Sequence, residues 1–329
     1  MPFLALIPLA LLISKRVIME PLFDNRRVSL ALDFDLDEQH HTKEMTQAMQ
    51  RISVSGVQEK FPAVVDGGKI RLVVAGERST HILKPAPWDA TLIERRQIPV
   101  NENLTMQIAS QVYGIPVAAN GLCTTPNKRY VYITRRFDIA PNGVKNSMED
   151  LASLIGKSEA IGGPAFKYNG SYLDIAQCIR RYIPAWMPDM ERFFELVVFN
   201  YIYANGDAHL KNFSVMLNGG DYSLTPAYDL LNTAIHVQDE DFALNGGLSP
   251  DMPRSYYYNL TGHPCRRDFE WFGREIGLVD IRMNRILDKY MLLPEQTKWL
   301  VKQSQLTEKM QRHYLRVVNE RVTWFVRKK

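Results

Sequence analysis

The chain has 329 residues, 46% hydrophobic and 23% charged, so it can bury a large core and has the composition of an ordinary soluble globular protein. Its formal net charge of +4 is too small to indicate nucleic-acid binding by itself, and it is compatible with a phosphate-bearing or acidic ligand. The isolated cysteines Cys123, Cys178 and Cys265 offer no disulfide framework or zinc site, and they favour a reducing compartment.

The first seventeen residues, MPFLALIPLALLISKRV, are an apolar run too short to span a bilayer. Basic residues follow the run instead of preceding it, and no small-residue cleavage site is evident, which disfavours a secretory signal peptide. Two main interpretations remain: an upstream mis-called start, with Met19 opening the ordinary sequence, or a short buried strand or helix. We expect a cytoplasmic protein in which residues 1–50 are an N-terminal extension whose role the sequence does not assign.

From Arg51 to about Asp138 the pattern is rich in strands. Two β-branched runs around an Asp-Gly-Gly turn predict a hairpin in FPAVVDGGKIRLVV (61–74). STHILKP (79–85) and RYVYITRRFD (129–138) predict two more strands. Between them, NENLTMQIASQVYG (101–114) has apolar residues at helical spacing and a glycine stop, which predicts an amphipathic helix.

After about Ala140 the pattern turns helical. Helices are predicted in residues 148–156, 172–182, 193–204 and 268–278, and a long C-terminal helix is predicted from about Pro294. One small β element interrupts them, the hairpin FSVMLNGGDYSLTP (213–226). The sequence therefore predicts an α+β, two-lobed protein-kinase-like fold, with a strand-rich N-lobe at 51–139 and a helical C-lobe at 140–329.

The loop NGDAHLKNF (205–213) carries chemically assorted polar residues directly after a strongly apolar helix. Phosphoryl transfer needs a carboxylate near the attacking hydroxyl, oxygen ligands for magnesium, and cations on the phosphates. Asp207 and Asn212 have the offset of the kinase pattern H-R-D-x-x-x-x-N. The hairpin brings Asp229, in TPAYDLLN, back toward this loop as a second oxygen ligand for magnesium. Lys84 is the candidate cation for the phosphates. SVSGVQEK (53–60) is a weak candidate for a phosphate loop, since it has a single glycine.

Each signal taken alone also has an ordinary structural interpretation. Asp207 can be a turn residue, His209 a structural hydrogen-bonding group, and Asp229 a helix cap. Lys84 can be an exposed strand end, and the loop serines solvent-facing hydroxyls. The order and spacing of the signals together favour the functional interpretation.

The segments SVSGVQEK, HILKP, NEN, RRFD, KYNGSY, GDAHLKNF and TPAYDLLN together resemble the HipA family of bacterial serine/threonine toxin kinases, from about Arg51 to the C-terminus. The resemblance implies that Asp207 is the catalytic base and that Asn212 and Asp229 are magnesium ligands. The positions that match the family's ATP-binding residues are Ser55, Gly56, Val57, Gln58, Glu59, Lys60, Lys84, Arg135, Arg136, Phe137, His209, Leu210, Lys211, Asn212, Tyr228 and Asp229.

The chain departs from the longer members of that family, because only about fifty residues precede the loop. This shortness is similar to HipT-type members, in which the missing N-terminal subdomain is a separate small protein. Those members also have a Ser-x-Ser before the glycine, as Ser53-Val54-Ser55 reproduces. The resemblance therefore implies autophosphorylation at Ser53 or Ser55. The apolar first seventeen residues have no counterpart in it.

The resemblance implies transfer of the ATP γ-phosphate to a protein hydroxyl with Mg²⁺, by the toxin of a toxin-antitoxin system that inhibits translation. The family's targets include aminoacyl-tRNA synthetases. The implied partners are a helix-turn-helix antitoxin and a separate small protein like the N-terminal subdomain, with DNA contacted only through the antitoxin and no membrane. Because H-R-D and D-F-G are both missing, a small-molecule phosphotransferase and a pseudokinase binding module remain alternatives.

Overall fold

The computed structural model describes residues 17–18, 20–36, 58–140 and 142–327, which form two compact units. The units are not contiguous in sequence, and the first division between them falls within helix α3 (Ile98–Tyr113). The ranges predicted from the sequence, 1–50, 51–139 and 140–329, stay a prediction. The first unit contains the described residues up to Leu104, together with Ala118–Phe137 and Trp299–Gln311; the second contains Thr105–Val117, Asp138–Lys298 and the described residues from Arg312 onward.

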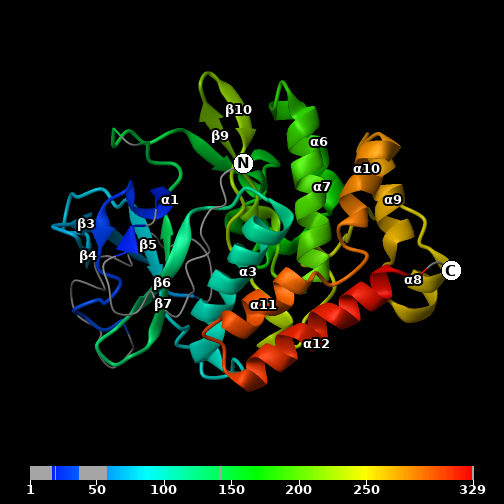
Figure 1. Cartoon of the computed structure of the whole chain (residues 1–329). Helices are drawn as coiled ribbons and strands as arrows, with labels where there is room; N and C mark the ends of the chain where they lie inside the picture. The colour runs from blue at the N-terminus through cyan, green and yellow to red at the C-terminus, as the bar shows by residue number, and fades with distance from the viewer. Residues whose placement is uncertain (1–16, 19, 37–57, 141, 328–329) are drawn as a thin grey trace. The chain divides into compact units, whose positions relative to one another are not determined.

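A five-stranded antiparallel sheet organises the first unit, with the strand order β4-β3-β5-β7-β6 (Figure 1). The predicted hairpin is confirmed: Asp66 pairs with Lys69, and the two intervening glycines have φ angles of 55° and 76°, as a two-residue turn of this kind requires. The predicted strands at 79–85 and 129–138 are also confirmed, as β5 and β7, whereas β6 was not predicted. The strands are β3 (Phe61–Asp66), β4 (Lys69–Leu72), β5 (His81–Lys84), β6 (Asn120–Thr124) and β7 (Tyr130–Arg135).

The described part of the N-terminal extension belongs to the core of this first unit. It contains β1 (Val17–Ile18), helix α1 (Glu20–Phe23) and β2 (Arg27–Val28). Apolar side chains from residues 22–36 pack with sheet side chains in one buried cluster. The apolar side chains of residues 22–36 thus cover one face of the sheet. Residues 1–16, for which the sequence left several interpretations, lie outside the described residues. The cluster consists of Leu22, Phe23, Val28, Leu30, Leu32, Leu36, Phe61, Ala63, Ile70, Leu83, Cys123, Val131 and Ile133.

The second unit is built on two long helices that pack side by side, α6 (Tyr172–Tyr182) and α7 (Trp186–Ile202) (Figure 1). Ser171 begins α6 with a capping box that includes Asp174. Most of α7 is buried, as its apolar sequence predicted. The predicted helices at 172–182, 193–204 and 268–278 are confirmed. The shorter helices of this region are α4 (Leu151–Leu154), α5 (Glu159–Gly162), α8 (Tyr256–Thr261), α9 (Arg266–Glu275) and α10 (Asp280–Asp288).

A small three-stranded sheet, in the order β10-β9-β8, lies in the second unit. The predicted hairpin is confirmed as β9 (Ser214–Asn218) and β10 (Asp221–Leu224). The helix predicted at 148–156 was wrong in its first turn, because β8 (Met148–Asp150) is a strand that pairs with β9. The helix α4 begins only afterwards, where the Asp150 side chain accepts a hydrogen bond from the Ser153 amide.

The long C-terminal helix predicted from about Pro294 is two helices, α11 (Glu295–Gln303) and α12 (Glu308–Phe325). At the break between the two helices, polar side chains form hydrogen bonds with backbone groups. The Ser304 hydroxyl donates to the Val301 carbonyl at 2.7 Å, and the Thr307 amide donates to the Gln97 side chain at 2.8 Å. Such side-chain bonds compete with helix continuation, which the apolar spacing alone did not reveal.

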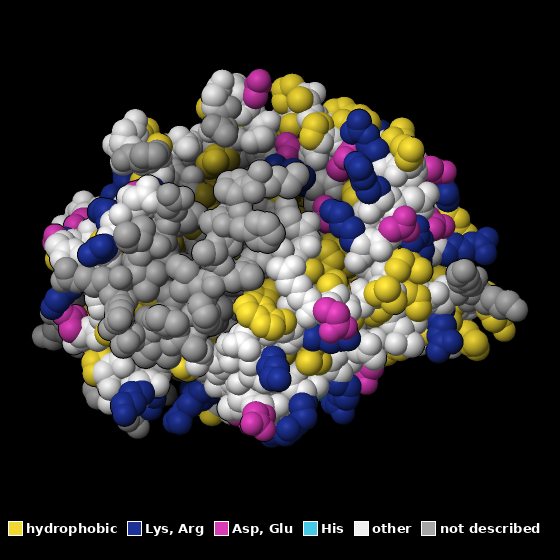
Figure 2. All heavy atoms as spheres, viewed as in Figure 1, with side chains coloured by type: hydrophobic (Ala, Val, Ile, Leu, Met, Phe, Trp, Pro, Cys, Tyr) yellow, Lys and Arg dark blue, Asp and Glu magenta, His cyan; other side chains and the backbone are white. Residues whose placement is uncertain are grey.

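The surface of the molecule carries both signs of charge, as the small net charge predicts. Figure 2 shows basic, acidic and hydrophobic side chains interspersed over the helical part of the face in view. All three cysteines are buried and free of disulfides. No helix in the described ranges has the length and apolar character needed to cross a membrane.

Candidate functional site

Lys84, at the end of β5, is buried and paired with a glutamate from α3. Its Nζ lies 2.6 Å from Glu102 Oε1, and both side chains are at least 95% buried. Tyr132 pairs with Lys84 across the strands and places its ring beneath the ammonium. This environment contradicts the interpretation of Lys84 as an exposed strand end. A strand lysine held by a helix glutamate is the arrangement that protein kinases use near the ATP phosphates.

Glu102 was not predicted as a site residue. The signal for it was present in the NEN segment of the resemblance, since Glu102 is its central residue. Its importance follows from burial, because removing one partner of a buried ion pair leaves the other charge uncompensated, at a cost of about 3–5 kcal/mol.

In the second unit, the loop after α7 is fixed by hydrogen bonds before it reaches Asp207. The Asn205 side chain donates to Asn200 Oδ1 at 3.0 Å and to the Asp229 carbonyl at 3.3 Å. The Gly206 amide donates to the Thr233 hydroxyl at 2.8 Å. The residues on both sides are buried, but the Asp207 side chain is 49% exposed. A half-exposed carboxylate on a rigid loop is suited to meeting a ligand.

Two side chains surround the Asp207 carboxylate. The Tyr168 hydroxyl donates to Asp207 Oδ1 at 2.7 Å, and His209 Nε2 lies 3.9 Å from the same oxygen. Burial and the adjacent Asp207 charge raise the pKa of Tyr168, so its hydroxyl remains a proton donor in this bond. Tyr168 was not predicted as a site residue, although the KYNGSY segment that contains it was part of the resemblance.

Asn212 and Asp229 are brought together by the turn after the loop and the hairpin that follows it. Asn212 ends a short 3₁₀ turn, η5 (Leu210–Asn212), where its Oδ1 accepts from the His209 amide at 3.0 Å. Its Nδ2 donates to Asp229 Oδ2 at 3.4 Å. Asp229 has a φ of 56°. This conformation is uncommon for residues other than glycine, and where it occurs it is found preferentially at functional sites.

The helix-cap interpretation of Asp229 does not hold. The next helical turn, η6 (Thr233–Ile235), has Asn232 at its N-cap position. Its neighbour Tyr228 instead connects the segment after the hairpin to the loop. The Tyr228 hydroxyl forms a hydrogen bond with Ser214 Oγ at 2.6 Å and donates one to the Lys211 carbonyl at 2.9 Å. The Asp229 carboxylate therefore faces Asn212 because the hairpin and the loop are bonded to each other.

This pair of side chains fits magnesium of the kind that phosphoryl-transfer enzymes use. The described residues contain no group of three or more His, Cys, Asp or Glu side chains suited to a protein-only metal site. Magnesium, however, is usually held by one or two carboxylates, with waters and substrate phosphates supplying the other ligands. Asp229 provides one carboxylate, and Asn212 Oδ1 has a second lone pair beyond its bond to His209.

Asp239 is a further acidic residue beside the Asp207 loop that the sequence did not predict. A Cβ atom at Gly206 would overlap its carboxylate, so the two residues are in direct contact. Burial and the nearby Asp207 charge raise the pKa of Asp239, whereas its hydrogen bonds to Thr233 and Glu240 oppose that shift. No motif pointed to it, because it lies outside every segment of the resemblance.

The other predicted ATP-binding residues belong to the first unit, and their role stays a prediction. Gln58 donates from its side chain to the Pro85 carbonyl at 3.1 Å, and Glu59 accepts from the Trp88 amide at 3.3 Å. Lys60, which follows them, is partly buried. Ser53, Ser55, Gly56 and Val57 lie outside the described residues.

Three more predicted ATP-binding residues, Arg135, Arg136 and Phe137, lie at the end of β7 and directly after it. Arg135 is ion-paired with Asp24, and Arg136 donates to Ser79 Oγ at 2.9 Å. Phe137, the last of the three, is partly buried. These contacts fix the backbone at the end of the sheet.

Comparison with known proteins gives three findings. Residues 52–297 match the HipA-like C-terminal domain family. "Putative kinase Y4mE" of Sinorhizobium fredii is 31% identical over 254 residues, which are 72% of this chain and 55% of that protein. "Putative kinase" of Haemophilus influenzae is 25% identical over 313 residues, which are 85% of this chain and 86% of that protein.

Among solved structures, HipA of Shewanella oneidensis MR-1, in its complex with HipB and operator DNA, is similar with a TM-score of 0.63 and 20% identity. The likeness covers 84% of this chain and 65% of that one, and it confirms the predicted HipA-like α+β fold. The chain spans about half the length of the Sinorhizobium relative described above.

Proposed function

We propose that this chain, which belongs to the HipA-like C-terminal domain family, is an ATP-dependent serine/threonine protein kinase that works with Mg²⁺. The observation that supports this most is the hydrogen-bonded pair of Asn212 and Asp229, with Asp207 in the same loop as Asn212. It combines a half-exposed carboxylate with two oxygen donors for a metal, which are the parts that phosphoryl transfer requires. The two relatives described above are named putative kinases, which agrees with this proposal.

In this proposal Asp207 accepts the proton of the acceptor hydroxyl. The hydrogen bond from Tyr168 orients its carboxylate. Asn212 and Asp229 hold Mg²⁺, which neutralises charge on the ATP phosphates when it is bound. Lys84 contacts the phosphates, and Glu102 fixes its position.

The acceptor is proposed to be a protein, an aminoacyl-tRNA synthetase being one example, in the cytoplasm. The solved relative is described as part of a toxin-antitoxin system with HipB and operator DNA. By analogy, we propose that this chain is the toxin of such a pair, inhibits translation, and contacts DNA through a helix-turn-helix antitoxin. A separate small protein, like the N-terminal subdomain of the longer family members, is proposed as a second partner.

Incubation of the purified chain with magnesium and γ-labelled ATP tests the activity. We expect phosphate on Ser53 or Ser55, located by mass spectrometry, and phosphorylation of a protein acceptor. Asp207→Asn should lower the rate by about 10²–10⁴-fold. Asp221→Asn, at the exposed tip of the hairpin, is the matched control and should keep the wild-type rate. Equal rates of phosphate transfer in the two variants would rule out Asp207 as the base. A wild-type chain that transfers no phosphate would rule out the proposed kinase activity.

A further inference from the structure

A cavity of about 760 Å³ lies within the first unit, separate from the Lys84–Glu102 pair. Its size is within the range of about 300–1,000 Å³ that is typical of small-molecule sites. Val131 lines it, whereas its strand neighbour Tyr132 packs beside Lys84. Tyr130 and Pro85 also line it, so the cavity lies next to the end of β5 and the start of β7, and neither Lys84 nor Glu102 is among its described lining residues. None of its described lining residues was predicted to bind ATP.

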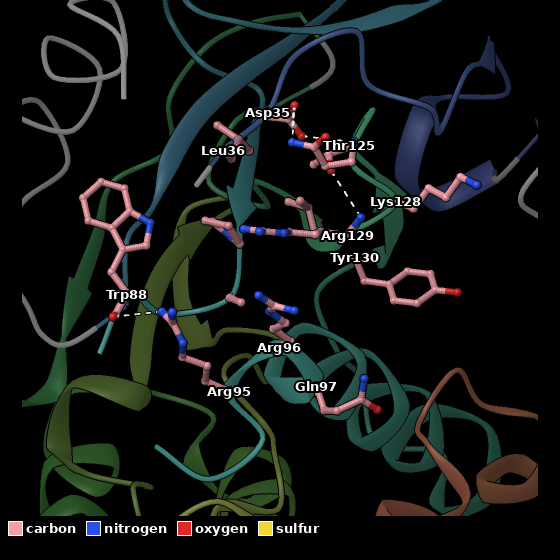
Figure 3. A pocket seen from close by; sticks show the side chains of 14 residues that line it. Asp35, Leu36, Trp88, Arg95, Arg96, Gln97, Thr125, Lys128, Arg129 and Tyr130 are labelled. Carbon is pink, nitrogen blue, oxygen red and sulfur yellow. Dashed lines mark hydrogen bonds between the residues drawn. The ribbon is translucent and has the colours of Figure 1, made fainter. Parts of the chain in front are cut away.

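The wall of this cavity is strongly basic. Arg95, Arg96, Lys128 and Arg129 line it, and Asp35 is the one acidic residue among the described lining residues. In Figure 3 the guanidinium groups of Arg96 and Arg129 extend into the same space, whereas the Lys128 side chain points away from it. Like charges so close repel each other, and an anion between them removes that repulsion.

One arginine of this cavity is positioned before any ligand arrives. Arg95 Nη1 donates to the carbonyls of Pro87 and Trp88, both at 2.8 Å, which fixes its guanidinium at the cavity edge. The Arg129 carbonyl accepts a hydrogen bond from the Thr125 amide at 3.0 Å, which closes the β6–β7 turn. A site whose donors are already fixed loses less conformational entropy on binding.

The single acidic residue does not balance the charge of the four basic ones. Asp35 accepts from the Asn127 amide at 3.3 Å and from its Nδ2 at 2.9 Å, so its carboxylate is engaged by the β6–β7 turn. Arg96, in contrast, forms no ion pair or hydrogen bond with any residue in the described ranges, and it is exposed. Its guanidinium is therefore available to a ligand.

We propose that this cavity binds the phosphate groups of a small phosphorylated molecule of about nucleotide size. Guanidinium groups bind phosphate oxygens through paired N–H donors, and a phosphate carries enough charge to neutralise more than one arginine. Trp88, Leu36 and Pro85 add an apolar wall on which the organic part of such a molecule can rest. The proposal does not depend on the kinase function, because its residues lie outside that candidate site.

Titration calorimetry on the full-length chain tests this with two probes, inorganic pyrophosphate and GDP. The titrations contain no magnesium and no other nucleotide, so that metal-dependent nucleotide binding at the candidate kinase site does not contribute and nothing else competes for the cavity. We expect binding that weakens as salt rises. Arg96→Ala should weaken it by roughly tenfold to a hundredfold, as the loss of a charge-assisted hydrogen bond predicts. Arg96→Lys should weaken it less, since it keeps the charge.

Arg27→Ala is the matched control, because Arg27 is an exposed arginine of β2 in the same unit and does not line the cavity. It should bind both probes as the wild type does. Binding of GDP well above pyrophosphate identifies a nucleotide as the ligand source, and equal binding identifies phosphate alone; both support the site. If neither probe binds, or if Arg96→Ala and Arg27→Ala bind them equally, the proposal is wrong. Melting temperatures of the variants show that each is folded.

Discussion

Replacing Gly206 with alanine tests whether the Asp207 loop depends on its contact with Asp239. The substitution adds one methyl group and requires no unusual backbone angle, because Gly206 is not among the residues with positive φ. The new Cβ would stand within 2.5 Å of Asp239 Oδ1, whereas ordinary contacts of this kind are 3.4–4 Å. The carboxylate, the loop or both must therefore move by about 1 Å.

The size of the effect follows from that displacement. Overpacking typically costs about 1–3 kcal/mol, which corresponds to a fall in melting temperature of about 2–4 °C per kcal/mol in a domain of this size. Asp207 follows Gly206 directly, and a displacement of about 1 Å at a reacting group can cost about 10²-fold in rate. We therefore expect Gly206→Ala to lose activity by about that factor and to melt at a lower temperature.

A double-mutant cycle identifies the cause. Asp239→Ala removes the carboxylate that the new methyl group would meet, so the double variant Gly206→Ala/Asp239→Ala should recover most of the lost stability and part of the activity. The expected interaction free energy is about 0.5–3 kcal/mol. Melting temperature and initial rate of phosphate transfer are measured on all four proteins. A double variant no more stable than Gly206→Ala would refute the contact, and a Gly206→Ala protein that behaves as wild type would refute the whole argument.

Three further changes test other parts of the molecule. Asp229→Ala should abolish phosphate transfer while leaving the melting temperature within a few degrees of wild type; an equal loss of both would mean that Asp229 is structural. Tyr168→Phe should slow transfer by roughly tenfold, because Asp207 loses one hydrogen bond, and an unchanged rate would show that the bond does not matter. Burial lowers the pKa of His81 below 6.5, so below that pH the unfolded chain binds more protons than the folded chain does. The melting temperature should therefore fall as the pH is lowered from about 7 to about 5. This fall should be smaller in His81→Gln.

The sequence by itself determined the elements whose signals are local. The two hairpins were predictable because Asp-Gly-Gly and Asn-Gly-Gly supply the positive φ angles that their turns require. The helices α6 and α7 were predictable from apolar spacing, and the family from short segments whose order is preserved. Asp207, Asn212 and Asp229 were identified in the same way, and their proximity was inferred from the fold that the segments resemble.

Only the tertiary structure decided the features that depend on partners distant in the chain. The strand at Met148–Asp150 exists because β9 pairs with it, and the break before α12 depends on a bond from Thr307 to Gln97. Glu102, Tyr168 and Asp239 belong with the candidate site for the same reason, since each is defined by a contact with a residue far from it in sequence. A pattern along the chain records spacing, but burial and pairing are properties of the folded molecule, and they made these residues part of the site.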